Sequence, residues 1–308
     1  MIRIFATTLL IAGIVLIIIL NPPLTYASKT TYNSYSIYHN KALNPAFTSK
    51  LEQATFLLKS SEFYGNELIL DICLNDGSIY PTLIKKLQGP AFARGFYNKV
   101  ILHGTMNCTA NYLELNGYKW NLVQLLVHEM THCLQYKKLG FWKSNPVANI
   151  PTWKWEGYAE YIARQDQNQN QKDLLLNINR LQTADKSKWE VVFEDGTIAP
   201  KDYYNSWNLV KYCLDIKKMS YEQLLQDKTS ESELKTQMMK WYEENKSERT
   251  TKAFTLMGAC QAYFSLNLRP SICSGLDSIL RQTNAISNKQ TLKAYLTGRT
   301  QHLLPPTA

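Results

Sequence analysis

Residues 127–136 read VHEMTHCLQY and place two histidines, His128 and His132, four positions apart. On an α-helix, residues i and i+4 share a face, so both imidazoles can point at one atom. The surrounding residues 121–139 (NLVQLLVHEMTHCLQYKKL) carry apolar side chains at roughly helical intervals, and Gly140 follows as a helix stop. The spacing therefore predicts a helix with a pair of imidazoles on one face.

The glutamate that follows the first histidine, Glu129, completes the pattern H-E-x-x-H. Two imidazoles on one face suit Zn²⁺, which binds neutral histidine nitrogens, and the acid of this pattern acts as a general base beside the metal. A catalytic zinc ion has three protein ligands and one open position. The pattern therefore predicts a zinc site, and it requires a third ligand elsewhere in the chain.

Candidates for the third ligand lie in residues 151–164 (PTWKWEGYAEYIAR). The proline at the start of this segment favours a helix, on which Glu156 and Glu160 would share one face. Tryptophans and tyrosines flank both acids, and an unpaired carboxylate in such surroundings is unfavourable. One loop separates the two predicted helices, which lets the second return beside the first. One of the two acids can then bind the metal while the other orients a histidine.

HEMTH (128–132) followed by WEGYAEY (155–161) resembles the gluzincin metallopeptidases, whose members include thermolysin and the zinc aminopeptidases. In those aminopeptidases, a W-x-x-E-G-x-A-type segment supplies the third zinc ligand as a glutamate that precedes a glycine. The resemblance therefore implies Glu156 as the third ligand and Glu160 as the acid behind a ligating histidine. It also implies a fold like the catalytic domain of thermolysin. No histidine follows H-E-x-x-H closely enough for the metzincin pattern.

The resemblance covers roughly residues 100–215 and departs from the family at two points. The 23 residues between His132 and Glu156 are more than the aminopeptidases usually have. Residues 103–107 (HGTMN) are similar to the G-x-M-E-N segment that holds a substrate's amino terminus, but they lack its glutamate. The resemblance thus implies a peptidase that is not a strict aminopeptidase. We interpret His103 as a packed histidine and not as a ligand.

Residues 203–214 (YYNSWNLVKYCL) resemble a later helix of the same superfamily, which opens with a tyrosine. In gluzincins, a tyrosine or histidine from such a helix donates a hydrogen bond to the transition state. The best match gives this role to Tyr203, because Ser206 then takes the small position three residues on. Tyr204 is the next residue, and a match shifted by one position would give this role to Tyr204. The alternative is that both tyrosines only pack in the core.

The mechanism implied by these residues is zinc-assisted hydrolysis of a peptide bond. His128, His132 and Glu156 would hold Zn²⁺. The ion would polarise the carbonyl and lower the pKa of bound water toward about 7. Glu129 would take the proton of the water and pass it to the leaving amine. The resemblance to gluzincins also implies that residues 100–104 form an edge strand that holds an extended peptide.

Two other functions remain open at this point. The first is a non-catalytic, zinc-containing envelope or surface binding protein with a gluzincin-like fold. The second is a secreted helical adhesion or assembly module in which H-E-x-x-H is accidental. The presence of Glu129 disfavours the first, because a structural metal site does not need a base. The second predicts that the protein binds no zinc.

Residues 1–27 form a separate segment, in which Arg3 precedes an apolar run at 4–20 and small residues occupy positions 25 and 27. This pattern predicts a secretory signal peptide that is cleaved after Ala27. The run also reaches the lower length limit for a membrane span, so an uncleaved N-terminal anchor is the alternative. Both interpretations place the remainder outside the cytoplasm, as a secreted, periplasmic or membrane-anchored protein.

The chain of 308 residues has a net charge of +9. Its lysines occur as scattered pairs without a basic run, which is typical of a solvated surface, so we expect a peptide or protein substrate and no nucleic-acid partner. Membrane contact is expected only through the N-terminal segment, and the oligomeric state is open. Six cysteines outside that segment permit disulfides, with Cys260–Cys273 the easiest pair by separation.

We expect an α+β fold in which residues 35–164 form the catalytic part, with a small mixed β-sheet and the H-E-x-x-H helix. Residues 174–300 would form a mainly helical C-terminal part after a polar loop at 165–173. Strand-like runs occupy residues 67–75, 94–104 and 110–117. Further helices are predicted at residues 49–61, 203–218, 220–226, 231–244 and 251–266.

Overall fold

The computed structural model describes residues 2–65, 68–165 and 173–246, which divide into two compact units. The first unit contains the described residues up to 165 together with residues 185–228, and the second contains residues 173–184 and 229–246. Residues 185–228 thus belong with the predicted catalytic part and not with a separate C-terminal part. The reason is the packing of helix α7 (Lys201–Lys211) along helix α5 (Thr152–Ala163) in the first unit.

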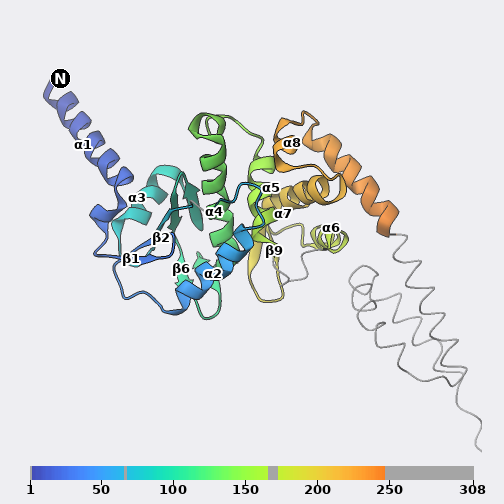
Figure 1. Cartoon of the computed structure of the whole chain (residues 1–308), viewed down its shortest axis with the longest axis horizontal. Coiled ribbons are helices and arrows are strands. Elements are labelled where there is room, and N and C mark those ends of the chain that lie inside the picture. Colours follow the sequence, from blue (N-terminus) through green and yellow to red (C-terminus); the bar gives the residue numbers. More distant parts are fainter. Residues whose placement is uncertain (1, 66–67, 166–172, 247–308) are drawn as a thin grey trace, which may run out of the picture. The chain divides into compact units, whose positions relative to one another are not determined.

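The larger sheet, of which Figure 1 labels β1 and β2, lies on the N-terminal side of the chain. It has five strands in the order β1, β2, β3, β5, β4. The inner strands β2, β3 and β5 are parallel, and the antiparallel strands β1 and β4 form the two edges. Parallel neighbours require crossover connections, which helices α2 and α3 provide. The predicted mixed sheet is confirmed. The bounds are β1 (Ser28–Tyr32), β2 (Tyr35–His39), α2 (Ala46–Leu58), β3 (Leu70–Cys73), α3 (Ile79–Gln88), β4 (Ala93–Phe96) and β5 (Lys99–Leu102).

The edge of the sheet next to β5 is formed by β4. The prediction of an edge strand at residues 100–104 is therefore wrong. The strand-like run at 94–104 contains a hairpin, because Tyr97 takes a φ of +56° and reverses the chain between β4 and β5. β5 then pairs with β4 on one side and with β3 on the other. Val100 and Ile101 are accordingly buried.

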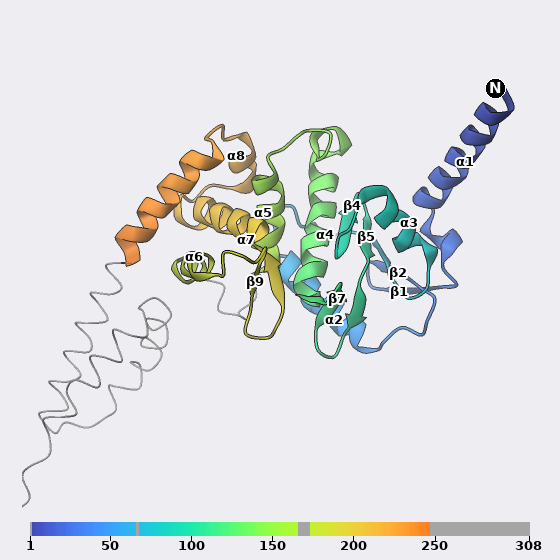
Figure 2. The same ribbon diagram turned by 180° about the vertical axis from the view of Figure 1, so that it is seen from behind.

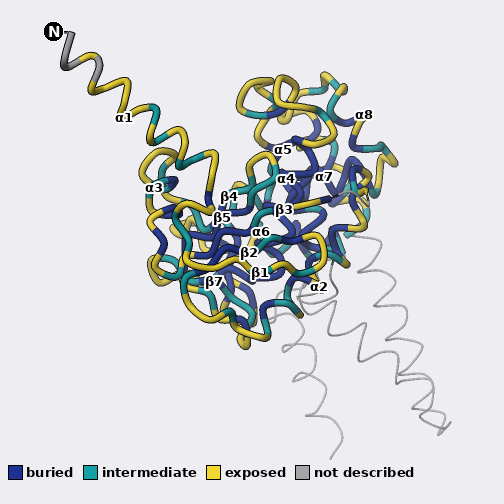
Figure 3. The backbone as a smooth tube through the Cα atoms, turned by 60° about the vertical axis from the view of Figure 1, so that its left-hand side comes forward, coloured by how far each residue is buried: buried dark blue, intermediate teal, exposed yellow. Residues whose placement is uncertain are grey.

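Helix α4 (Leu122–Leu139) carries the H-E-x-x-H pattern and lies at the centre of the first unit (Figure 2). The side chain of Asn121 caps its start by accepting a hydrogen bond from the backbone N–H of Gln124, and Gly140 follows its end with a φ of +78°. Strand β4 and helices α2 and α5 surround it, so every residue from 122 to 136 is buried (Figure 3). A helix buried on all sides is part of the core. The predicted helix is confirmed.

Helix α5 follows Pro151, as predicted, and packs between α4 and α7. Gly157 permits the approach of α7, because a Cβ atom at this position would lie 2.5 Å from the carbonyl oxygen of Ser206. Helix α8 (Tyr221–Gln226) begins at Ser220 with the predicted capping box. In the second unit, the predicted helix at 231–244 is present at 231–246, and α6 (Leu174–Thr183) precedes it in sequence.

Short strands lead directly into two of these helices. The meander β6 (Thr105–Asn107), β7 (Tyr112–Leu115) and β8 (Tyr118–Asn121) ends where α4 begins. The hairpin β9 (Glu190–Val192) and β10 (Ile198–Pro200) ends where α7 begins. A chain that changes from strand to helix without a loop fixes the direction of the helix. The remaining short elements are η2 (Phe141–Lys143) and η4 (Tyr212–Ile216).

The N-terminal segment comprises α1 (Ile2–Leu20) and η1 (Pro22–Thr25). Ile18, Ile19 and Tyr26 pack against a buried cluster beside α3 that consists of Tyr38, Cys73, Tyr80, Ile84 and Ile101. The Tyr80 hydroxyl donates to the carbonyl of Ile19 at 2.9 Å. Among the residues that the structure describes, no helix combines the length and apolarity needed to cross a membrane. Cleavage after Ala27 stays a prediction.

Four of the six cysteines lie in the described residues, and all four have free thiols: Cys73, Cys108, Cys133 and Cys213. All are buried, so they behave as small apolar core residues. The predicted pair Cys260–Cys273 and the predicted helix at 251–266 lie outside the described residues.

Candidate metal centre

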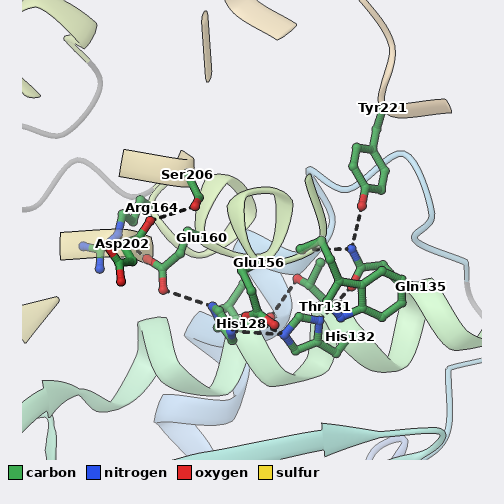
Figure 4. A network of polar contacts seen from close by, with 12 residues as sticks. His128, Thr131, His132, Gln135, Glu156, Glu160, Arg164, Asp202, Ser206 and Tyr221 are labelled. Atoms are coloured by element: carbon green, nitrogen blue, oxygen red, sulfur yellow. Dashed lines mark hydrogen bonds and ion pairs between the residues drawn. The ribbon is translucent and has the colours of Figure 1, made fainter. Parts of the chain in front are cut away.

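Three donor atoms from α4 and α5 converge on one point (Figure 4). The Nε2 atoms of His128 and His132 lie 3.1 Å apart, and Oε2 of Glu156 lies 3.1 Å from the first and 3.3 Å from the second. Ligand atoms on bonds of about 2.0–2.1 Å at tetrahedral angles lie about 3.3 Å apart, which is the geometry of a zinc site. The two nitrogens and one oxygen therefore form a face that fits a tetrahedral zinc ion. The structure thus brings the three predicted ligands together.

No other group of three or more potential ligands with metal-binding geometry occurs among residues 2–65, 68–165 and 173–246. The two histidines are one helical turn apart on α4, and the glutamate faces them from α5. The two Nε2 atoms and the carboxylate thus meet at the contact between two buried helices. Side chains that emerge from packed helices are held more rigidly than side chains on loops.

His128 is oriented from behind by Glu160, the second acid of α5. Nδ1 of His128 lies 3.0 Å from Oε1 of Glu160, an ion-pair distance, although the two atoms are not aligned as a good hydrogen bond. The other oxygen of Glu160 accepts a hydrogen bond from Nε of Arg164, whose Nη1 donates to Gln124 at 3.3 Å. A carboxylate at Nδ1 favours the tautomer with the proton on Nδ1 and the lone pair on Nε2. Glu160 therefore occupies the supporting position that the sequence predicts.

The electrostatics of this cluster favour ionised carboxylates. Burial by itself would raise the pKa of Glu156, yet His132 and His128 hold that pKa well below its ordinary value. Burial also opposes ionisation of Glu160, but Arg164 and His128 hold its pKa below the ordinary range. Two buried carboxylates that stay charged require positive charge nearby. Arg164 supplies that charge at Glu160, and at Glu156 a divalent cation between the three donor atoms would supply it when both histidines are neutral.

Glu129 lies beside the three ligand residues and is buried. Burial raises the pKa of Glu129 above its ordinary value and outweighs the neighbouring histidines and a backbone hydrogen bond from Gly95, which lower it. The hydrogen bond comes from the edge strand β4, which lies directly against the backbone of α4. A Cβ atom on Gly95 would lie 2.0 Å from the carbonyl oxygen of Glu129. Only glycine permits this contact, which links the edge strand to the predicted base.

We expect Gly95→Ala to destabilise the protein by about 1–3 kcal/mol, the range for overpacking a close contact. The added methyl group would meet backbone atoms, which cannot move away by changing a rotamer. Chemical denaturation of both proteins measures the change in the free energy of unfolding. Gly65→Ala is the matched control, since a Cβ atom there meets nothing within 4 Å, and it should change stability by less than about 1 kcal/mol. Equal stability of Gly95→Ala and wild type would contradict the contact.

A cavity of about 920 Å³ opens in front of the three ligand residues and Glu129. The four residues of β4 form one wall, and aromatic side chains cover much of the rest. A cavity of this size is typical of sites that bind small molecules or cofactors. The aromatic lining residues are Phe92, Phe96, Tyr118, Trp120, Tyr136, Trp155, Trp189 and Tyr203.

The two tyrosines at the start of α7 have different surroundings. Tyr203 lines the cavity, and its ring stacks on that of His128 at 5.7 Å with an interplanar angle of 10°. Burial, together with the charges of Glu156 and Glu129, raises the pKa of Tyr203, so its hydroxyl keeps the proton and can donate it in a hydrogen bond. Tyr204 is fully buried and packs against Trp207, away from the cavity lining. Tyr203 is thus the tyrosine that faces the candidate site.

Other residues singled out in the sequence lie elsewhere. Residues 103–107, which are similar to the segment that binds a substrate's amino terminus, do not line the cavity. His103 is buried just after β5 and does not join the three ligand residues, and burial lowers its pKa to about 4. Gln135, which contacts His132, was not predicted. Its position three residues after His132, on the same face of α4, was the only signal in the sequence.

Comparison of the sequence with models of protein families gave no match, and comparison with curated proteins gave no match either. The function is therefore inferred from the chemistry of His128, His132 and Glu156 and of the side chains around them.

Proposed function

We propose that this protein is a zinc-dependent metallopeptidase of the gluzincin type, which hydrolyses peptide bonds outside the cytoplasm. The observation that carries the proposal is the convergence of His128, His132 and Glu156 beside Glu129 in an open cavity. A purely structural zinc ion is enclosed by four protein ligands, whereas three ligands leave a position open for chemistry. The location outside the cytoplasm is supported by the pattern of residues 1–27.

The substrate would bind along strand β4. The outer edge of β4 has no partner strand among the described residues, and β4 lines the cavity. An extended peptide can add to such an edge through main-chain hydrogen bonds. The carbonyl to be attacked would then lie near Glu129, because Gly95 of β4 contacts the backbone of that residue. The loss of the amino-terminus-binding glutamate supports action on internal bonds.

Zinc bound by the three ligand residues would supply Lewis acidity, which polarises a carbonyl and lowers the pKa of water toward about 7. The carboxylate of Glu129 would accept a proton from the attacking water and pass it to the nitrogen of the leaving amine. The hydroxyl of Tyr203 would donate a hydrogen bond to the carbonyl oxygen as negative charge develops there. The aromatic walls would exclude bulk water and strengthen these interactions.

Metal analysis of the purified protein tests the proposal. We expect one zinc ion per chain, removed by a chelator together with peptidase activity. His132→Ala is the control that removes one ligand, and it should contain no zinc above background. Purified wild-type protein without metal, and with unchanged properties in a chelator, would refute the zinc site. Zinc without hydrolysis of any peptide in a mixed peptide library would favour the non-catalytic binding protein.

Tyr203→Phe should lower kcat by roughly 10²–10³ while zinc content and KM change little, the effect of losing one donor to a developing oxyanion. The substitution removes one oxygen and retains the ring that stacks on His128. Steady-state kinetics on a cleaved peptide measure the effect. Tyr204→Phe is the matched control and should retain wild-type kcat, because Tyr204 does not line the cavity. Normal rates in both variants would remove tyrosine from the mechanism.

A further inference from the structure

Gln135 lies behind His132 on helix α4 and is fully buried. Its Oε1 atom is 2.8 Å from Nδ1 of His132, on the side of the imidazole that faces away from the three donor atoms (Figure 4). His128 has a charged acid in the equivalent place, whereas His132 has a neutral amide. An amide can accept a hydrogen bond through its oxygen or donate through its nitrogen. Which of the two faces His132 decides the tautomer of the ring.

The orientation of the Gln135 amide is determined by its other contacts. Its Nε2 donates to the backbone carbonyl of Trp155 at 3.2 Å and to the hydroxyl of Tyr221 at 2.8 Å, which uses both of its hydrogens. The Tyr221 hydroxyl in turn donates to the carbonyl of Lys154 at 3.2 Å, so it can only accept from Gln135. A flipped amide would place its oxygen against the Trp155 carbonyl oxygen. The oxygen of Gln135 therefore faces His132.

Tyr221 is itself held in place from two sides. Its backbone N–H donates to the carboxylate of Glu62, at 2.9 and 3.1 Å from the two oxygens. Its ring stacks on that of Tyr158 at 3.6 Å with an interplanar angle of 4°, and the Tyr158 hydroxyl contacts Ser61. The start of α8, helix α5 and the chain after α2 thus hold the group that orients the amide. Side-chain networks that satisfy every donor and acceptor fix one arrangement.

We infer that Gln135 is a positioning residue, which keeps the proton of His132 on Nδ1 and the lone pair on Nε2. Since Oε1 of Gln135 can only accept, Nδ1 of His132 must donate. Nε2 then carries the lone pair that a metal requires, and it points at His128 and Glu156. This inference rests on the proposed function for its metal, but the tautomer can be measured in the metal-free protein, where Oε2 of Glu156 lies 3.3 Å from Nε2 and competes with Gln135 for the proton.

Two variants of the full chain separate this role from simple packing. Gln135→Met keeps the length of the side chain and removes both hydrogen-bonding groups, whereas Gln135→Glu keeps an oxygen that accepts from Nδ1. We expect Gln135→Met to bind zinc about 10–100-fold more weakly than wild type, the usual effect of losing a group that orients a ligand. Gln135→Glu should restore part of that affinity, because its second oxygen can accept from the Tyr221 hydroxyl but faces the Trp155 carbonyl. Competition with a chromogenic chelator measures the affinities, and circular dichroism shows whether each variant is folded.

The second measurement is the tautomer of His132 in the metal-free protein. Long-range ¹H–¹⁵N spectra, recorded where the ring is neutral and assigned with His132→Ala, distinguish a proton on Nδ1 from one on Nε2. We expect Nδ1–H in wild type and in Gln135→Glu, and a shift toward Nε2–H in Gln135→Met. Tyr221→Phe is the control: it removes one acceptor of the amide but leaves the Trp155 carbonyl, so Nδ1–H should persist.

Three results would overturn the inference. The first is Nε2–H as the tautomer of metal-free wild type, and the second is a folded Gln135→Met with wild-type zinc affinity. The third is an equal loss of affinity in folded Gln135→Met and Gln135→Glu, which would assign Gln135 to packing alone. Wild-type protein that binds no zinc would refute the proposed function instead, and the tautomer would still decide the role of Gln135.

Discussion

Glu129→Gln is expected to retain zinc and to lose hydrolysis by a factor of about 10²–10⁴, the contribution of a general base. The substitution is nearly isosteric, and the amide oxygen can still accept the backbone hydrogen bond from Gly95. The amide cannot take a proton from water, so only the chemical step should suffer. The measurement is kcat on any peptide that the wild type cleaves, together with the zinc content of the variant.

The matched control for this experiment is Glu222→Gln on helix α8. The side chain of Glu222 is 54% exposed, and the residue does not line the cavity, so its kcat should equal that of wild type. Equal turnover by wild type and Glu129→Gln would remove Glu129 from the mechanism. A loss of zinc in Glu129→Gln would instead mean that the acid supports the metal.

Glu156→Ala and Glu160→Ala should separate in two measurements that move in opposite directions. Loss of a ligand should reduce zinc affinity by more than about 100-fold, whereas loss of an orienting carboxylate costs about 10–100-fold. The free energy of unfolding of the metal-free protein should show the reverse order, with Glu160→Ala less stable than Glu156→Ala. Glu160→Ala takes the carboxylate from the buried guanidinium of Arg164, and breaking a buried ion pair costs about 3–5 kcal/mol.

Zinc titration and urea denaturation of the metal-free proteins test the two acids together. Glu156 is the more exposed of the two, and its carboxylate pairs with the two histidines, whereas that of Glu160 pairs with Arg164, so removal of Glu156 should destabilise the fold less than removal of Glu160. A greater loss of zinc affinity in Glu160→Ala would exchange the two roles. Equal affinities in both variants and wild type would exclude both acids from the metal site.

The sequence predicts the parts of this site that depend on helical periodicity. H-E-x-x-H places His128 and His132 on one face of α4, and the same spacing places Glu156 and Glu160 on one face of α5. The predicted mixed α/β composition also follows from local patterns. The likeness to the catalytic domain of thermolysin stays a proposal, because it concerns how the elements are arranged.

Long-range pairing explains what the sequence could not predict. The run at 94–104 is apolar in both of its strands, and nothing local indicates that β3 pairs with β5 and leaves β4 at the edge. Residues 203–226 are helical in pattern, but only the close contact at Gly157 shows that α7 belongs with α5. Glutamine is an ordinary residue type in a helix, so the sequence around Gln135 does not indicate its role. That role depends on partners from α5 and α8.

Gly95 contacts α4 through backbone atoms of both elements. The Glu129 carboxylate, which accepts the hydrogen bond from Gly95, is the one side-chain group in this contact. If a peptide lies along β4, the distance between its scissile bond and Glu129 is set by main-chain geometry, which is the same for every amino-acid sequence of the peptide. Arg94 and Phe96 flank this contact and line the cavity, so their side chains would meet those of such a peptide. In the proposed peptidase, substrate preference would then diverge during evolution, or be redesigned, through positions 94 and 96 while position 95 remains glycine and the catalytic alignment is unchanged.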